Sequence, residues 1–413
     1  MIGTGVFTSL GYQLVDIQSI FPLIMLWVIG GIIALCGALS YSELATLYPR
    51  SGGEYHLLST IIHPSIGFAA GIVSATVGFT APSVLAAMAL GNYMSPVIPF
   101  IDPIIIALVV IISIHCLHMI NIRLGIIFQD SLTLIKIGLI FFFIIFGTFV
   151  ENNEQISMVP VFDDMKIILS PEFAISLIWV SYAYTGWNSA VYVAGEIESP
   201  EINIPKSMIV ATMFVTVLYL FLNYIFLYTT PIDLMIGKVE VGYIVGQQIF
   251  GHFGGKLISL GISILLLSTV SSYVYIGPRI MHAMGEDYKT LAILSAKNID
   301  GIPFKSFWIQ LIISIIFILT STFEQVLLYA GISLIVTTIF TVTALFVLRI
   351  TEPNLKRTYK VPGFPILPTL FLIINGWILY YSFQRVFIES LIGCGIFTLG
   401  VLLYFILKKL EEK

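Results

Sequence analysis

The sequence predicts an all-helical integral membrane protein. The chain has 413 residues, of which 58% are hydrophobic and 10% are charged, whereas an ordinary soluble protein carries roughly 25% charged residues. Its mean hydropathy is +1.01. Apolar runs of about 20 residues recur along the chain, as a helix needs to cross a hydrocarbon core of about 30 Å. A soluble chain this apolar could not cover its surface with polar groups, so the membrane class follows.

The apolar segments predict eleven full spans preceded by one partial span. Their connections are short, so we expect one transmembrane domain over 1–413 and no soluble domain. The expected spans cover residues 1–14, 20–47, 65–90, 103–120, 126–149, 173–195, 206–229, 256–282, 306–321, 325–349, 366–383 and 387–407.

Glycine and hydroxyl residues interrupt two of these spans, at Met1–Phe7 and at Ser181–Asn188. In lipid a weakened helix is tolerated only where the freed backbone groups face protein, water or a ligand. Each break opens a set of five spans, and an odd number gives two repeats of opposite topology. This is the inverted-repeat plan of many secondary transporters. The plan predicts one repeat over about 1–150, a second over about 171–350, and accessory helices over about 366–407.

The two breaks together predict a site for a zwitterion. The first break leaves amide groups free at the positive end of a helix, where a carboxylate binds. The second frees carbonyl groups, which can accept hydrogen bonds from an ammonium group. The alternatives are a tight helix contact through small residues and an aromatic packing stripe. The candidate substrate-binding residues are Ile2, Gly3, Thr4, Gly5, Tyr182, Ala183, Tyr184, Thr185, Gly186 and Asn188.

Lys136 is the only basic residue deep inside an expected span. A lysine at the bilayer centre costs roughly 2.5–3.5 kcal/mol on insertion scales. It could therefore be a proton carrier, or a fixed cation where other transporters bind sodium. The hydroxyl cluster Ser268–Ser272 could bind it, so we take Lys136, Ser268 and Ser271 as candidates for proton coupling. The alternatives are a lysine that reaches the interface and hydroxyls that bond their own helix.

Other chemistries have little support in the sequence. We expect no enzyme, cofactor or metal site, because no nucleophile–base pair or cluster of metal ligands is present, and His115 and His118, three apart on one helix face, have no carboxylate nearby. A net charge of −4 without a basic tract argues against nucleic acid. Glu43 and Glu54 flank a glycine-containing inner loop, and we expect Glu43 to pair with a basic residue as part of an inner gate.

Basic residues predict the orientation of the chain. Of the 19 lysines and arginines, 14 fall in one set of loops and the C-terminal tail, and 4 fall in the alternate loops. The richer side is expected to be cytoplasmic, which places the C-terminus inside.

Several motifs, in order along nearly the whole chain, resemble the amino acid–polyamine–organocation superfamily, nearest its L-amino-acid-transporter-like permeases. The motifs are Ile2–Phe7, Tyr41–Leu44 with Pro49–Tyr55, Tyr182–Asn188 with Gly195–Ile197 and Pro200, Gly277–Arg279, and Arg357–Gly363.

The resemblance implies a LeuT-type fold of five plus five inverted-repeat helices with two extra helices, and transport of amino acids. It implies that Ile2–Gly5 and Tyr182–Gly186 hold the substrate backbone. Lys136 matches a lysine that takes the place of a sodium ion in proton-coupled relatives. Thr185 departs from the glycine of many relatives, so pocket size does not carry over. Some relatives bind a glycoprotein through a cysteine, but the cysteines of this chain (Cys36, Cys116 and Cys394) lie in expected spans. No covalent partner is therefore expected.

We therefore expect a secondary active amino acid permease in the inner membrane of a prokaryote. It would work by alternating access, as a proton-coupled symporter or an exchanger, with amino acid, lipid bilayer and protons as partners. The substrate would bind between spans 1 and 6, with spans 3, 8 and 10 supplying its side-chain pocket. One alternative is a sensor of the same fold that binds amino acids without flux. Another is an inactive, N-terminally truncated permease, because the chain opens inside an apolar segment where relatives have a tail and a first half-helix.

Overall fold

A computed structural model describes residues 1–120, 123–150, 159–298 and 301–411. Within these ranges the chain is helical and contains no β-strand, as the sequence predicts. The helices are α1 (Gly5–Asp16), α2 (Ile20–Leu47), α3 (Gly53–Ile61), α4 (Pro64–Val73), η1 (Ser74–Gly78), α5 (Thr80–Met94), α6 (Pro103–Ile120), α7 (Arg123–Gly147), α8 (Phe162–Ile168), α9 (Pro171–Tyr184), α10 (Ser189–Tyr192), η2 (Ala194–Glu196), α11 (Pro200–Thr229), α12 (Ile232–Met235), α13 (Val241–Asp287), η3 (Lys289–Leu291), α14 (Ala292–Ser295), α15 (Phe304–Thr320), α16 (Phe323–Thr351), α17 (Ile366–Arg385) and α18 (Phe387–Glu411).

Each expected span coincides with helix. Among the described residues, eight helical segments are long and apolar enough to cross a membrane, or nine if α8 and α9, bent by 64°, form one span. The segments Leu132–Gly147 and Phe304–Thr320 are apolar but shorter. The protein is therefore a multi-pass helical membrane protein, whereas the count of eleven full spans stays a prediction.

Local sequence explains several helix starts. Proline stands in the first turn of α4, α9 and α11, where its fixed φ suits a helix and its missing amide hydrogen has no helical partner. The Ser170 hydroxyl accepts a hydrogen bond from the Phe173 amide at 3.3 Å and so caps α9. Thr322 and Gln325 form a reciprocal capping box at the start of α16.

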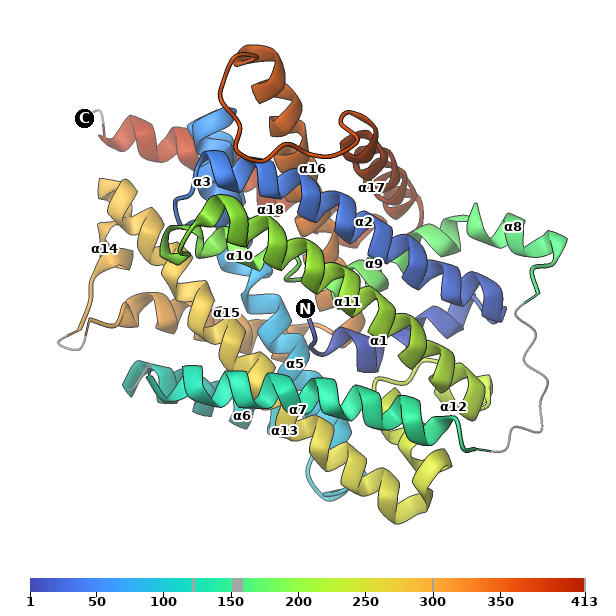
Figure 1. Cartoon of the computed structure of the whole chain (residues 1–413). Helices are drawn as coiled ribbons and strands as arrows, with labels where there is room; N and C mark the ends of the chain where they lie inside the picture. The colour runs from blue at the N-terminus through green and yellow to red at the C-terminus, as the bar shows by residue number, and fades with distance from the viewer. Residues whose placement is uncertain (121–122, 151–158, 299–300, 412–413) are drawn as a thin grey trace.

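The helices pack as a bundle in which α11 lies along α2, α13 along α5 and α18 along α4 (Figure 1). Small residues allow close approach: a Cβ on Gly31 of α2 would lie 2.4 Å from the Thr216 side chain of α11. On the outside, α6, α17 and α18 expose large apolar side chains such as Val109, Ile373 and Leu399. Such a surface suits contact with lipid.

Two departures from regular helix bear on the site. A π-helical turn, η1, joins α4 to α5 within one span, and such turns are frequent at functional sites. Figure 1 also shows the first residues of the chain inside the bundle, beside α1 and α11. There the Tyr219 hydroxyl of α11 donates to the Met1 carbonyl at 3.0 Å.

Candidate functional site

A cavity of about 690 Å³ lies where the two broken segments meet. Seven of the ten residues predicted to bind substrate contribute to its wall. The remaining three, Thr4, Gly5 and Ala183, are buried. The seven wall residues are Ile2, Gly3, Tyr182, Tyr184, Thr185, Gly186 and Asn188.

The first break ends in the N-terminus of α1. Thr4 is the residue before the helix, and its carbonyl accepts the amide of Phe7 at 3.1 Å. The amides from Gly3 to Val6 have no hydrogen-bond partner in the described parts of the chain. Free amides at a helix N-terminus, together with the helix dipole, form a site for an anion.

The second break follows the last residue of α9. Thr185 turns back on the helix end, and its amide and hydroxyl both donate to the Tyr182 carbonyl, at 3.0 and 2.7 Å. The Ala183 carbonyl accepts the Tyr219 hydroxyl at 3.3 Å. The Tyr184 carbonyl has no partner among the described residues. Of the carbonyls of Tyr182, Ala183 and Tyr184, that of Tyr184 therefore has the most accepting capacity left for an ammonium group.

The two breaks touch each other directly. A Cβ added to Gly5 would lie 2.4 Å from the Cα of Ala183, so the backbones approach too closely for any side chain there. Gly186 has a φ of +92°, a conformation that glycine adopts at little cost. A Cβ at that position would lie 3.2 Å from the Met1 nitrogen. Glycines thus allow the two breaks to form one site.

Lys136 faces the cavity from α7. Its side chain is buried, although the preceding residues Leu134 and Ile135 are exposed at 72% and 55%. Its Nζ atom donates to the Thr269 hydroxyl of α13 at 2.9 Å. Lys136 is the only charged side chain among the described residues of the wall.

The hydroxyl cluster predicted on α13 therefore contacts Lys136 through Thr269. The two serines singled out in the sequence have other partners. The Ser268 hydroxyl donates to the Leu265 carbonyl at 3.1 Å, and Ser271 lies 2.8 Å from Nε2 of His118. Their assignment to proton coupling stays a prediction.

More spans line the cavity than the sequence suggested. The expected spans 3, 8 and 10 contribute, among others, Phe79, Tyr273 and Leu334. Spans 2, 7 and 11 contribute as well, for example through Ile33 and Phe371. Phe79 directly follows the π-helical turn, and no sequence pattern signalled that turn.

The inner loop contacts two residues of the cavity wall through Glu54, which the sequence placed only beside a loop. Its carboxylate is buried and accepts hydrogen bonds from the Asn188 amide at 2.5 Å and from the Tyr192 hydroxyl. Both partners line the cavity. Burial raises the pKa of the Glu54 carboxyl, and the bonds from Tyr192 and Asn188 oppose that rise. The sequence signal that could have identified Glu54 is an acidic residue directly after two glycines and close to an apolar span.

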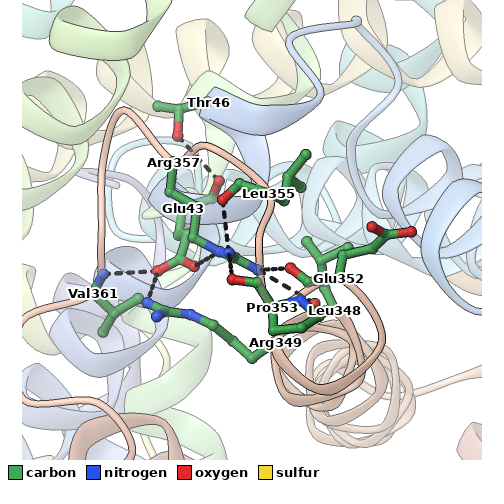
Figure 2. Close-up of polar contacts among 9 residues, drawn as sticks. All are labelled: Glu43, Thr46, Leu348, Arg349, Glu352, Pro353, Leu355, Arg357 and Val361. Carbon is green, nitrogen blue, oxygen red and sulfur yellow. Dashed lines mark hydrogen bonds and ion pairs between the residues drawn. The ribbon is translucent and has the colours of Figure 1, made fainter.

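Glu43 lies in a separate buried cluster (Figure 2). Its carboxylate pairs with Arg349 at 2.7 Å and with Arg357 at 3.1 Å, and it accepts the Val361 amide at 2.8 Å. The expected pairing of Glu43 with a basic residue is confirmed. Its role in a gate stays a prediction.

A second cavity of about 380 Å³ adjoins the first. The two share four wall residues, Tyr192, Val193, Ser272 and Ile276. The second also includes Ser51 and Arg279, which the distribution of basic residues assigns to the expected cytoplasmic side. The second cavity therefore lies next to the central cavity on that expected side.

Comparison with known protein families agrees with this site, which two broken helices form inside a membrane bundle. The sequence model of the amino acid permease family matches residues 1–402. The chain belongs to the amino acid permease family. The resemblance proposed from the motifs is thereby confirmed, and the permease has the helical transporter fold of that superfamily.

Relatives of the permease span nearly its whole length. It is 27% identical to the serine/threonine exchanger SteT of Bacillus subtilis, over 99% of this chain and 94% of that protein. It is 25% identical to the mouse b(0,+)-type amino acid transporter 1, over 98% of this chain and 84% of that protein. It is 23% identical to the human large neutral amino acids transporter small subunit 2, over 98% of this chain and 77% of that protein.

Proposed function

We propose that the permease carries small neutral amino acids by alternating access, exchanging one for another. The supporting observation is the cavity of about 690 Å³ between the two breaks, within the roughly 300–1,000 Å³ usual for small-molecule sites. The amides from Gly3 to Val6 would bind the substrate carboxylate, and the Tyr184 carbonyl would bind its ammonium group. The adjoining second cavity would serve as the route to the cytoplasm.

Lys136 supports the restriction to neutral substrates. It is the only charged side chain among the described wall residues, so a second positive charge on the substrate would be repelled in a medium of low dielectric constant. Serine and threonine are the first substrates to test, because one relative is named an exchanger of these two amino acids. Exchange is also the activity in that name.

Counterflow in proteoliposomes tests the proposal. Vesicles loaded with unlabelled serine should take up external labelled serine faster than vesicles loaded with buffer, and lysine should compete poorly. Empty liposomes are the control for leakage. Saturable binding without flux would favour the sensor, and the absence of both uptake and binding would contradict the proposal.

Proton-coupled symport is the second candidate, favoured by the contact between Lys136 and Thr269. If Lys136 carries the proton, Lys136→Ala should abolish uptake driven by a pH gradient into serine-free vesicles. Lys206, an exposed lysine that does not itself line the cavity, provides the matched control Lys206→Ala. Unchanged pH dependence in Lys136→Ala would reject the proton role and leave exchange.

The membrane and the partners follow from the same reasoning. We propose that the permease lies in the inner membrane of a prokaryote with its C-terminus in the cytoplasm, because of the distribution of basic residues. We propose no covalent partner subunit. The three cysteines lie in α2, α6 and α18, at positions that the sequence assigns to membrane spans.

A further inference from the structure

Glu54 contacts two wall residues of the central cavity, Asn188 and Tyr192, without lining the cavity itself. It stands in the first turn of α3, and its side chain is 2% exposed. The preceding Gly53 has a φ of +60°, and a Cβ there would lie 2.3 Å from the ring of Tyr192. Only glycine lets the inner loop pass so close to α10 with this backbone conformation. The loop thereby delivers a carboxylate to Asn188 and Tyr192.

A carboxylate restricts the orientation of the asparagine amide. Ionised glutamate only accepts hydrogen bonds, whereas an asparagine side chain has an NH₂ donor and an oxygen acceptor. The Asn188 NH₂ group therefore faces Glu54, at 2.5 Å from Nδ2 to Oε1. Burial raises the pKa of Glu54, and the hydrogen bond from the Tyr192 hydroxyl to the other carboxylate oxygen favours the ionised form against that rise.

The side-chain oxygen of Asn188 is therefore left to face the cavity. Asn188 lines the cavity wall, and its Oδ1 atom accepts no hydrogen bond from the described residues. We propose that Glu54 is a positioning residue of the substrate site, which orients Asn188 so that it presents a hydrogen-bond acceptor to the substrate. This inference rests on the proposed function, since it assigns a partner within the same site.

The substrate group that meets this acceptor is a hydrogen-bond donor. The α-ammonium group, present in every amino acid, is one source. The side-chain hydroxyl of serine or threonine is the other. Alanine distinguishes the two sources, because it has the ammonium group but no side-chain hydroxyl.

Glu54→Gln tests whether Glu54 orients the Asn188 amide or only fills space beside it. Glutamine has the size of glutamate and can still bond both partners, but its amide can donate as well as accept. The Asn188 amide then loses its imposed orientation. We expect KM for serine to rise about fivefold to tenfold, the range for one hydrogen bond, at unchanged maximal rate. Glu54→Asp, which keeps an acceptor-only carboxylate, should recover part of the loss.

A double-mutant cycle tests whether Glu54 acts through Asn188. KM is measured for the wild type, Glu54→Gln, Asn188→Ala and the double variant, with serine and alanine as substrates. We expect Glu54→Gln to have no further effect once Asn188 is alanine. An effect on both substrates identifies the ammonium group as the donor, and an effect on serine alone identifies the hydroxyl. Equal effects of Glu54→Gln in both backgrounds, or an unchanged KM, would overturn the proposal.

The same double-mutant cycle can be measured without transport, from the rise in melting temperature that serine produces in each purified variant. If the wild type shows binding but no flux, the proposed transport function fails, while the cycle in binding affinity still decides the role of Glu54. If Glu54→Gln lowers the melting temperature and leaves the serine affinity unchanged, Glu54 has a structural role only, and the proposal is wrong. If the wild type shows neither flux nor binding of serine or alanine, both proposals fail, the transport assay having already rejected the first.

Discussion

Single residues at the two breaks control how closely two backbones approach. Gly5 and Ala183 belong to segments almost 180 positions apart in sequence, yet a Cβ on Gly5 would meet the Cα of Ala183 at 2.4 Å. This contact brings the amides at the start of α1, which have no partner among the described residues, beside the end of α9. Because both groups belong to the backbone, their chemistry depends on the position of the chain more than on side-chain identity.

Gly5→Ala should therefore disturb the site through sterics alone. The added methyl group would overlap backbone atoms that cannot move independently, so we expect a loss of about 1–3 kcal/mol in stability together with strongly reduced uptake. Thermal unfolding in detergent and serine uptake measure the two effects. Gly376→Ala is the control, because a Cβ there meets nothing within 4 Å. Wild-type behaviour of Gly5→Ala would contradict the close packing of the breaks.

Thr269→Val tests the partner of Lys136. Valine keeps the shape of threonine but removes the oxygen that lies 2.9 Å from Nζ. Membrane hydrogen bonds contribute about 0.6 kcal/mol on average, so we expect a small loss of stability and a clear change in the pH dependence of uptake. The control is Thr337→Val, since the buried Thr337 hydroxyl bonds the Ser333 carbonyl of its own helix. If both variants share the wild-type pH profile, the Lys136–Thr269 contact has no part in coupling.

At the scale of elements, the segments that hold the site are connected by buried polar contacts. The cluster in Figure 2 ties α2 to the end of α16 and to the connection that leads to α17. Arg357 also donates to the Leu355 and Glu352 carbonyls, each at 2.9 Å. A carboxylate that is 0% exposed between two arginines is stable only while all of its partners remain, because unpaired buried charges are expensive.

Glu43→Gln should destabilise the protein by about 3–5 kcal/mol, since it leaves two arginines without their counter-charge. Glu172→Gln is the matched control: it removes a carboxylate from the ion pair with Arg385, whose side chains are 32% and 55% exposed. Exposed pairs contribute only about 0.2–1 kcal/mol. The melting temperatures of the two variants in detergent give the comparison. Similar small losses would show that the Glu43 cluster contributes no more than a surface pair.

At the scale of the whole molecule, the distribution of basic residues predicts the orientation in the membrane. The basic loops should face the cytoplasm, so Lys356→Cys should be protected from a membrane-impermeant thiol reagent in intact cells. Lys238→Cys, on the opposite side, should react. Both lysines are exposed, and the three native cysteines are first replaced by serine or alanine. The reverse labelling pattern would invert the proposed topology.

The sequence determined those properties that depend on neighbouring residues. Apolar runs predicted the helices, and basic residues predicted the orientation. Glycine and hydroxyl residues located both breaks, because a weakened helix in lipid requires a compensating environment. Lys136 stood out for the same reason, since a charge inside an apolar run needs a partner. The family followed from motifs that are local as well.

Only the tertiary structure decided which of these groups meet. Thr269, and not Ser268 or Ser271, contacts Lys136, because helix rotation and a lysine's reach select one hydroxyl from a cluster. The Tyr184 carbonyl has no partner in the described parts of the chain, because Thr185 folds back on Tyr182. Glu54 reaches Asn188 across 134 positions of sequence, and neither residue signals the other. Such contacts depend on the packing of distant helices, which no local pattern of residues records.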